Sequence, residues 1–241
     1  MSLDIGSALA DGAQRTFKRN GLILAGLLFA VSILSIVFSN SLVQAMFDEG
    51  ILPPEYMTES VPMALGLSST VSGLGLFLTF IASAIVGITA LRTLVSNETE
   101  TIPREYFTRN LGLAIVNLFF GGIAFAVAVT LGFIALIIPG FFLLVSLYFW
   151  NVFVIVEDQN FIEAFKSSWN LTEGNRLELF GLGVIVFIGV AVISGIFGAI
   201  GIAIELLAGS TASSIFNLIP NAFLSVFTVA TVAQAYNQLR E

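Results

Sequence analysis

The sequence contains no histidine and no cysteine. These absences exclude histidine-based acid–base catalysis, Ser–His and Cys–His nucleophilic pairs, metal sites built from thiolate or imidazole, and disulfides. Charged side chains are also scarce, at 10% of 241 residues against roughly 25% in soluble domains. We therefore expect no catalytic residue, no metal site and no cofactor, and no enzymatic activity.

Basic residues are few as well: nine Lys and Arg stand beside sixteen Asp and Glu, for a net charge of −7. Nucleic-acid binding needs a basic patch, so no nucleic-acid partner is expected. Hydrophobic side chains make up 57% of the chain, and apolar runs longer than about 18 residues recur along it. The composition predicts an all-α polytopic membrane protein whose first partner is the lipid bilayer.

Hydrophobic segments divide the chain into six predicted transmembrane helices within a single domain, residues 1–241. Their approximate bounds are 21–47, 63–95, 111–138, 141–156, 177–207 and 212–239. The second segment is longer than the ~20 residues that cross a bilayer, so we expect its start to lie on the membrane surface.

The division between the third and fourth spans rests on an uncharged stretch from Asn110 to Val156. As one helix these 47 residues would be about 70 Å long, over twice the ~30 Å hydrocarbon core. Pro139 lacks an N–H and Gly140 tolerates left-handed backbone angles, so the predicted turn falls at these two residues. The alternative, one kinked helix, would put the flanking basic residues on opposite sides of the membrane.

All nine basic residues fall on one side of the six-span topology: Arg15, Lys18, Arg19, Arg92, Arg104, Arg109, Lys166, Arg176 and Arg240. Positive charge marks the cytoplasmic side of a membrane protein. The sequence therefore predicts a multi-pass protein of the cell membrane with both termini in the cytoplasm.

Two short amphipathic helices are predicted on that cytoplasmic side. In residues 1–20, Ile5, Leu9, Ala13 and Phe17 recur every four residues. In residues 160–173, Asn160 can cap a helix whose apolar stripe is Phe161, Phe165 and Trp169. Both patterns are typical of helices that lie at the membrane surface.

Five polar residues are candidates for lining a polar cavity: Asn117, Asn151, Asn217, Asn221 and Glu205. Asn217 and Asn221 are four residues apart and share one helix face, beside Pro220. The asparagines could equally form hydrogen bonds between helices. Glu205 is either an ordinary glutamate at the outer interface or a carboxylate that couples transport to ions.

Residues 137–175 carry a family resemblance. The pattern is a Pro-Gly pair, a span, an acidic pair and then a Trp-containing helix: Pro139, Gly140, Glu157, Asp158, Glu163, Ala164, Ser168, Trp169, Thr172 and Gly174. It resembles six-span membrane-domain families related to the membrane domain of glycerophosphoryl diester phosphodiesterases. The resemblance implies a fold rather than a reaction, because the soluble phosphodiesterase domain of some relatives is absent from this sequence.

Two functions remain compatible with these residues. One is a membrane scaffold or interaction component, with a second copy or another membrane protein as partner, since small residues at four-residue spacing let helices approach closely. The other is secondary transport, export or lipid handling through the polar faces of spans three, four and six. A water-filled cavity reaching Asn151 or Asn217 would favour transport, and tight packing there would favour the scaffold.

Overall fold

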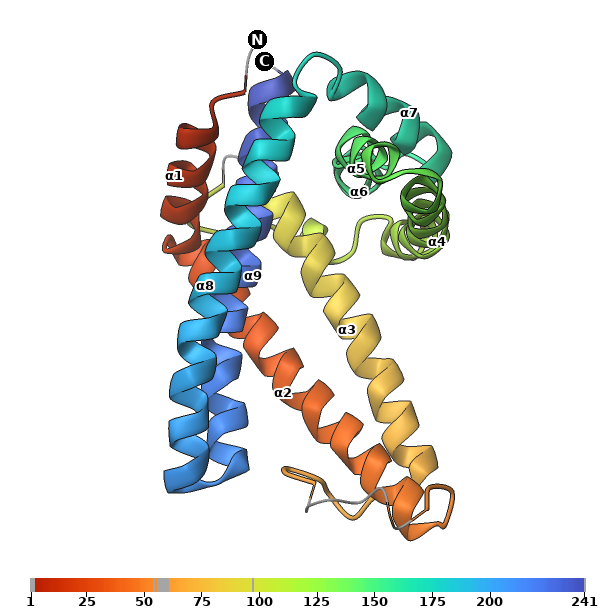
Figure 1. Cartoon of the computed structure of the whole chain (residues 1–241), viewed down its shortest axis with the longest axis vertical. Helices are drawn as coiled ribbons and strands as arrows, with labels where there is room; N and C mark the ends of the chain where they lie inside the picture. The colour runs from red at the N-terminus through yellow and green to blue at the C-terminus, as the bar shows by residue number, and fades with distance from the viewer. Residues whose placement is uncertain (1–2, 54, 56–60, 97, 241) are drawn as a thin grey trace. The chain divides into compact units, whose positions relative to one another are not determined.

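A computed structural model describes residues 3–53, 55, 61–96 and 98–240, and within these ranges the chain is helical with no strand. Figure 1 shows the helices. Their bounds are α1 Ile5–Thr16, α2 Arg19–Asp48, α3 Ser69–Val95, α4 Leu111–Ala135, α5 Ile137–Ser146, α6 Trp150–Val156, α7 Phe161–Leu171, α8 Arg176–Ala208 and α9 Ser210–Arg240.

Six helical segments in the described residues are long and apolar enough to cross a membrane: α2, α3, α4, α5 with α6, α8 and α9. This confirms the all-α fold class with six membrane-spanning helices. The predicted surface-lying start of the second span is not helical, since α3 begins only at Ser69.

The chain forms two compact units. One contains residues 1–23, 87–190 and 225–241, and the other contains residues 24–86 and 191–224. The first unit holds all of α1 and α4–α7 together with the adjoining ends of α2, α3, α8 and α9.

The core of the first unit surrounds α6, a helix of seven residues of which five are buried. Val152 and Val154 point into the core with no more than 1% of their surfaces exposed. On α9, Tyr236 is fully buried and its ring meets the Phe153 ring edge-to-face, with 5.5 Å between the centroids. A short helix buried on nearly all sides needs partners for both of its ends, and these partners form the candidate site below.

The turn between the third and fourth spans lies three residues before the predicted position. Leu136 is extended, with φ −164° and ψ 153°, and α5 begins at Ile137. Pro139 is therefore the third residue of α5, where its missing N–H has no intrahelical partner to lose. The prediction that the chain turns at Pro139 and Gly140 is wrong, although the prediction of two helices rather than one is confirmed.

Gly140 is glycine because α4 and α5 pack closely, and its backbone has no positive φ. A Cβ at Gly140 would lie 2.4 Å from the Phe133 ring, and one at Gly132 would lie 3.0 Å from the Gly140 Cα. The two glycines face each other across the hairpin. Close helix approach therefore explains both residues.

The predicted apolar stripe of α1 describes only part of its packing. Ile5 and Leu9 pack against the core, but the buried residues of α1 are Ala8, Gly12 and Thr16, while Phe17 is 68% exposed. A Cβ at Gly12 would lie 3.0 Å from the backbone of Thr231 on α9. The small-residue face of α1 thus packs on α9.

In the second unit, the loop before α3 is fixed by side chains. Glu49 accepts a hydrogen bond from the Ser69 N–H at 2.9 Å, and Ser41 Oγ accepts one from the Leu65 N–H at 2.8 Å. The bond from Ser69 lowers the pKa of Glu49 below its ordinary value of 4.5. The carboxylate also lies at the positive end of the α3 dipole, where negative charge is stabilising.

Candidate functional site

The start of α7 is held by two asparagines. The Asn160 side chain accepts hydrogen bonds from the N–H groups of Ile162 and Glu163 at 3.1 and 3.0 Å, which confirms the predicted N-cap. On α4, Asn117 Oδ1 accepts a bond from the Phe161 N–H at 3.1 Å. These bonds satisfy N–H groups that a helix start leaves without an intrahelical partner. Asn117 is therefore a structural link between α4 and α7.

The break between α5 and α6 is closed by hydroxyl groups from α7. Ser168 Oγ accepts a hydrogen bond from the Phe149 N–H at 3.0 Å and donates one to the Ser146 carbonyl at 3.1 Å. Thr172 Oγ1 donates to the same carbonyl at 3.2 Å. Ser168, Thr172, Ser146 and Phe149 are all fully buried. Non-helical backbone at this depth persists only where such partners replace water.

A buried arginine closes the other end of α6. Arg92, with 3% of its surface exposed, donates from Nε to the Ile155 carbonyl at 2.9 Å and from Nη1 to the carbonyls of Tyr106 and Arg109. Its Nη2 lies 3.6 Å from the Asp158 carboxylate, which also pairs with Arg109 at 3.3 Å. The carbonyls at the end of a helix carry partial negative charge, so a cation there is stabilising.

The neighbouring carboxylate, Glu157, ties this end of α6 to the end of the chain. It accepts a hydrogen bond from the Tyr236 hydroxyl and forms an ion pair with Arg240 at 2.6 Å. Arg240 also donates to the Tyr236 hydroxyl at 3.2 Å. The acidic pair thus joins α6 to α9 through Glu157 and to α3 and the α3–α4 loop through Asp158.

Arg15 of α1 performs the same role for α3. Its guanidinium donates to the carbonyls of Leu94 and Ser96 at 2.8 and 2.6 Å, at the C-terminal end of α3. Burial lowers the pKa of Arg15, and the nearby Asp11 carboxylate partly opposes that shift. An arginine remains charged despite such a shift, because its ordinary pKa lies far above neutral pH.

The other predicted polar candidates are also placed by the structure. Asn217 of α9 packs directly over Gly201 of α8, where an added Cβ would lie 2.4 Å from the Asn217 amide. Its Nδ2 donates to the Ser213 carbonyl at 3.0 Å, and Asn221 donates to the Asn217 carbonyl at 2.8 Å. Glu205 is exposed in the last turn of α8.

Asn151 differs from the other three candidate asparagines. It lies on α6, half-buried, and its Oδ1 is buried with no hydrogen-bond partner among the described residues. Of the five candidates, Asn117 and Asn151 lie in the first unit, and Glu205, Asn217 and Asn221 lie in the second.

An apolar groove of about 750 Å³ lies in the first unit along one face of α8. Tyr148 and Thr228 carry the polar groups among its described lining residues. The groove is lined by Phe141, Leu144, Val145, Tyr148, Leu179, Phe180, Gly183, Val184, Val186, Phe187, Val190 and Thr228, which come from α5 and the residues after it, α8 and α9.

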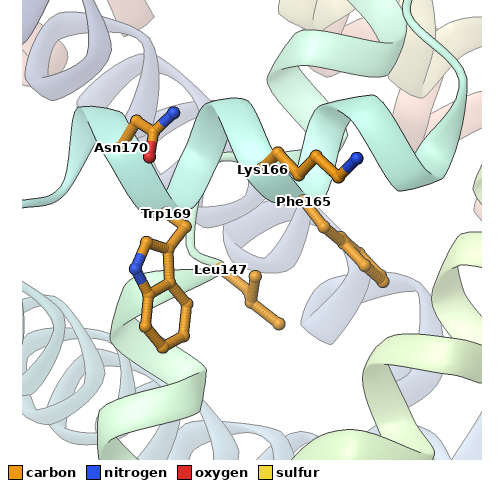
Figure 2. Close-up of a pocket in the computed structure, with 5 residues that line it drawn as sticks. All are labelled: Leu147, Phe165, Lys166, Trp169 and Asn170. Atoms are coloured by element: carbon orange, nitrogen blue, oxygen red, sulfur yellow. The ribbon is translucent and has the colours of Figure 1, made fainter.

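A second hollow, of about 540 Å³, lies beneath α7. In Figure 2, Phe165 and Trp169 extend from the same side of α7 with Leu147 in the space between them, while the ends of Lys166 and Asn170 lie at the level of the helix. The hollow therefore has apolar walls and a polar rim.

Sequence reasoning did not identify Arg92, Ser168 or Thr172 as structural partners of α6. In the sequence, Arg92 is a basic residue at the end of a predicted span. An exposed arginine at that position would equally mark the cytoplasmic side of the membrane, so the sequence does not show that Arg92 is buried. Ser168 and Thr172 share a face of α7 with Ala164, and a small-residue face at four-residue spacing is a packing signal. That signal indicates a buried face but does not name its partner.

The fold and this arrangement define a multi-pass α-helical membrane protein, in contact with lipid through the exposed apolar side chains of its long helices. Several of its polar side chains bond to helix ends and to the break in one span. The chain belongs to the family described as a domain of unknown function, DUF7847, whose model matches residues 3–239. Comparisons with curated proteins and with solved structures give no match.

Proposed function

We propose that this protein is a non-enzymatic membrane scaffold or interaction component of the cell membrane, with α1, α7 and both termini on the cytoplasmic side. All nine basic residues lie in or next to α1 and α7, in the α3–α4 loop, or at the helix ends that adjoin these segments. The positive-inside rule then places these segments in the cytoplasm. The partner is another membrane protein or a second copy of this chain.

The proposal rests on the hydrogen bonds that polar side chains form with the backbone of neighbouring helices. Asn117 holds α7, Ser168 and Thr172 close the broken span, and Arg92 and Arg15 occupy helix ends. A side chain committed to the backbone of a neighbouring helix is not available to bind a passing substrate. These bonds support a rigid body that presents α1 and α7.

The resemblance to the membrane domain of glycerophosphoryl diester phosphodiesterases is consistent with this role. Glu157 and Asp158 were part of that pattern, and both serve as partners of arginine and tyrosine side chains. Carboxylates in such pairs are suited to fixing helices, and we propose that this is their role here. No phosphodiester chemistry is proposed for them.

Secondary transport is the alternative, and the unpartnered Oδ1 of Asn151 favours it. A buried acceptor without a partner costs about 1–3 kcal/mol, unless water or a ligand supplies the missing hydrogen bond. A polar substrate that bound there would have to reach α6 from both sides of the membrane.

Solute flux through proteoliposomes separates the two functions. Purified protein is reconstituted at several protein-to-lipid ratios, and the permeation of sodium, protons, glycerol and amino acids is followed by dye fluorescence and light scattering. The scaffold predicts rates equal to those of protein-free liposomes at every ratio. A flux that rises with protein content, saturates with solute and falls in Asn151→Ala would replace the scaffold with a transporter.

A further inference from the structure

Arg176, the first residue of α8, lies close to the apolar groove along that helix. Arg176 stands one helical turn before Phe180, which lines the groove, so the two side chains share a face of α8. The Arg176 guanidinium stacks on the Phe142 and Trp169 rings, at 4.7 and 4.9 Å from their centroids. Trp169 also lines the hollow beneath α7, together with Lys166.

Neither Arg176 nor Lys166 forms an ion pair with a described residue. The ion pairs in the described part of the chain involve Arg92, Arg109 and Arg240. Arg176 donates from Nη2 to the Trp169 carbonyl at 3.3 Å, and its Nε is buried with no hydrogen-bond partner among the described residues. A buried guanidinium donor without an acceptor is costly, and an anionic oxygen would satisfy it.

The dimensions of the groove suit one hydrocarbon chain. Along α8 it runs from Leu179 to Val190, which is about 17 Å at 1.5 Å per residue, close to the ~15 Å depth of one leaflet. Its volume of about 750 Å³ lies within the range of about 300–1,000 Å³ that is usual for small-ligand pockets. Gly183 contributes to that space, since a Cβ there would meet nothing within 4 Å.

We propose that this groove is a binding site for one anionic phospholipid from the surrounding bilayer. One hydrocarbon chain lies along α8 between α5 and α9, and the phosphate group lies at Arg176, beside the Trp169 ring. Basic pockets beside membrane helices recognise anionic headgroups in this way, and an indole ring favours the level of the headgroups. The site depends on the membrane-spanning fold and is independent of the scaffold role.

Native mass spectrometry tests the site. The whole protein is released from detergent that contains equimolar phosphatidylglycerol and phosphatidylcholine with identical acyl chains. The wild type should retain phosphatidylglycerol preferentially. Arg176→Gln should lower that preference about tenfold, as expected for the loss of one charge-assisted contact. Arg176→Lys should keep part of it, and Arg104→Gln, which removes an exposed arginine elsewhere, should leave it unchanged.

The groove is tested separately with two glycines of α8. Gly183→Leu fills the groove and should abolish retention of the lipid, whereas Gly189→Leu, equally free of close neighbours but outside the groove, should not. Circular dichroism and gel filtration confirm that each variant is folded. Equal retention of the two lipids by the wild type, or equal effects of the two leucines, would overturn the proposal.

Inorganic phosphate distinguishes a lipid site from a simple anion site. Inorganic phosphate at about 10 mM should not displace bound phosphatidylglycerol if the hydrocarbon chain contributes most of the binding free energy. Displacement that depends on Arg176 would show that the site binds free anions, and the proposal of a phospholipid would fall.

Discussion

Replacing Ser168 with alanine tests whether α7 holds the broken span together. The Ser168 hydroxyl is the acceptor for the buried Phe149 N–H, and it donates to the Ser146 carbonyl. Ser168→Ala leaves the N–H with no acceptor, while the carbonyl keeps its bond from Thr172. A buried donor left unpaired costs about 1–3 kcal/mol. This exceeds the ~0.6 kcal/mol average for hydrogen bonds between membrane helices, because here no alternative partner is available.

Thr172→Val should cost less, about 0.5–1.5 kcal/mol, because the Ser146 carbonyl then keeps its bond from Ser168. In the double variant Ser168→Ala/Thr172→Val that carbonyl loses both donors. The double variant should therefore be destabilised by more than the sum of the single variants, with a coupling of at least about 0.5 kcal/mol.

The assay is reversible unfolding in mixed micelles, followed by circular dichroism and by tryptophan fluorescence, with Ser167→Ala as the matched control. Ser167 lies on the same helix and loses the same hydroxyl, so its change should stay within about 0.5 kcal/mol. A cost for Ser168→Ala that equals that of Ser167→Ala, with additive effects in the double variant, would refute the role assigned to these hydroxyl groups.

Three further predictions concern other parts of the chain. Gly132→Ala should destabilise the α4–α5 hairpin by about 1–3 kcal/mol in the same assay, because its Cβ would lie 3.0 Å from the Gly140 Cα. Gly122→Ala should be neutral, because a Cβ there would meet nothing within 4 Å. Equal effects of the two variants would contradict the close approach of α4 and α5. Glu49 has a lowered pKa in the folded protein, so its contribution to stability is complete above pH 4.5 and is lost as the pH falls through the lower folded-state value. Glu49→Gln should therefore flatten the acid side of the stability profile, and an unchanged profile would remove the role of the Ser69 bond. In the cysteine-free chain, Glu55→Cys should react with an impermeant thiol reagent from outside cells and Lys166→Cys should not; reaction of both from the same side would contradict the six-span topology.

The number of membrane helices could be predicted because it depends on length and composition. An uncharged stretch of 47 residues is too long for one crossing, whichever residues occupy the turn. The position of that turn could not be predicted, because Pro139 and Gly140 are compatible with a turn and equally with a first helical turn that packs closely. What decided between them is the contact between Gly140 and α4, which joins residues on different helices.

The roles of polar residues were predictable where the partner is local and unpredictable where it is distant. Asn160 caps the helix that follows it, within three residues, and this was predicted. Asn117 bonds to a residue 44 positions away and Arg92 to one 63 positions away. A single sequence shows that such residues are polar, but the packing of helices decides whether they line a cavity or hold a backbone.

Thiol accessibility at Asn151 tests most directly the claim that polar groups in this membrane domain maintain its structure. Single cysteines replace Asn151 and Asn217 in reconstituted protein, with Lys166→Cys as the exposed control, and each is treated with an impermeant methanethiosulfonate from either side. We expect complete labelling at Lys166→Cys from one side of the membrane and no labelling at Asn151→Cys or Asn217→Cys from either side. Labelling of Asn151→Cys or Asn217→Cys would show that water reaches the interior, and the protein would then have to be considered a transporter.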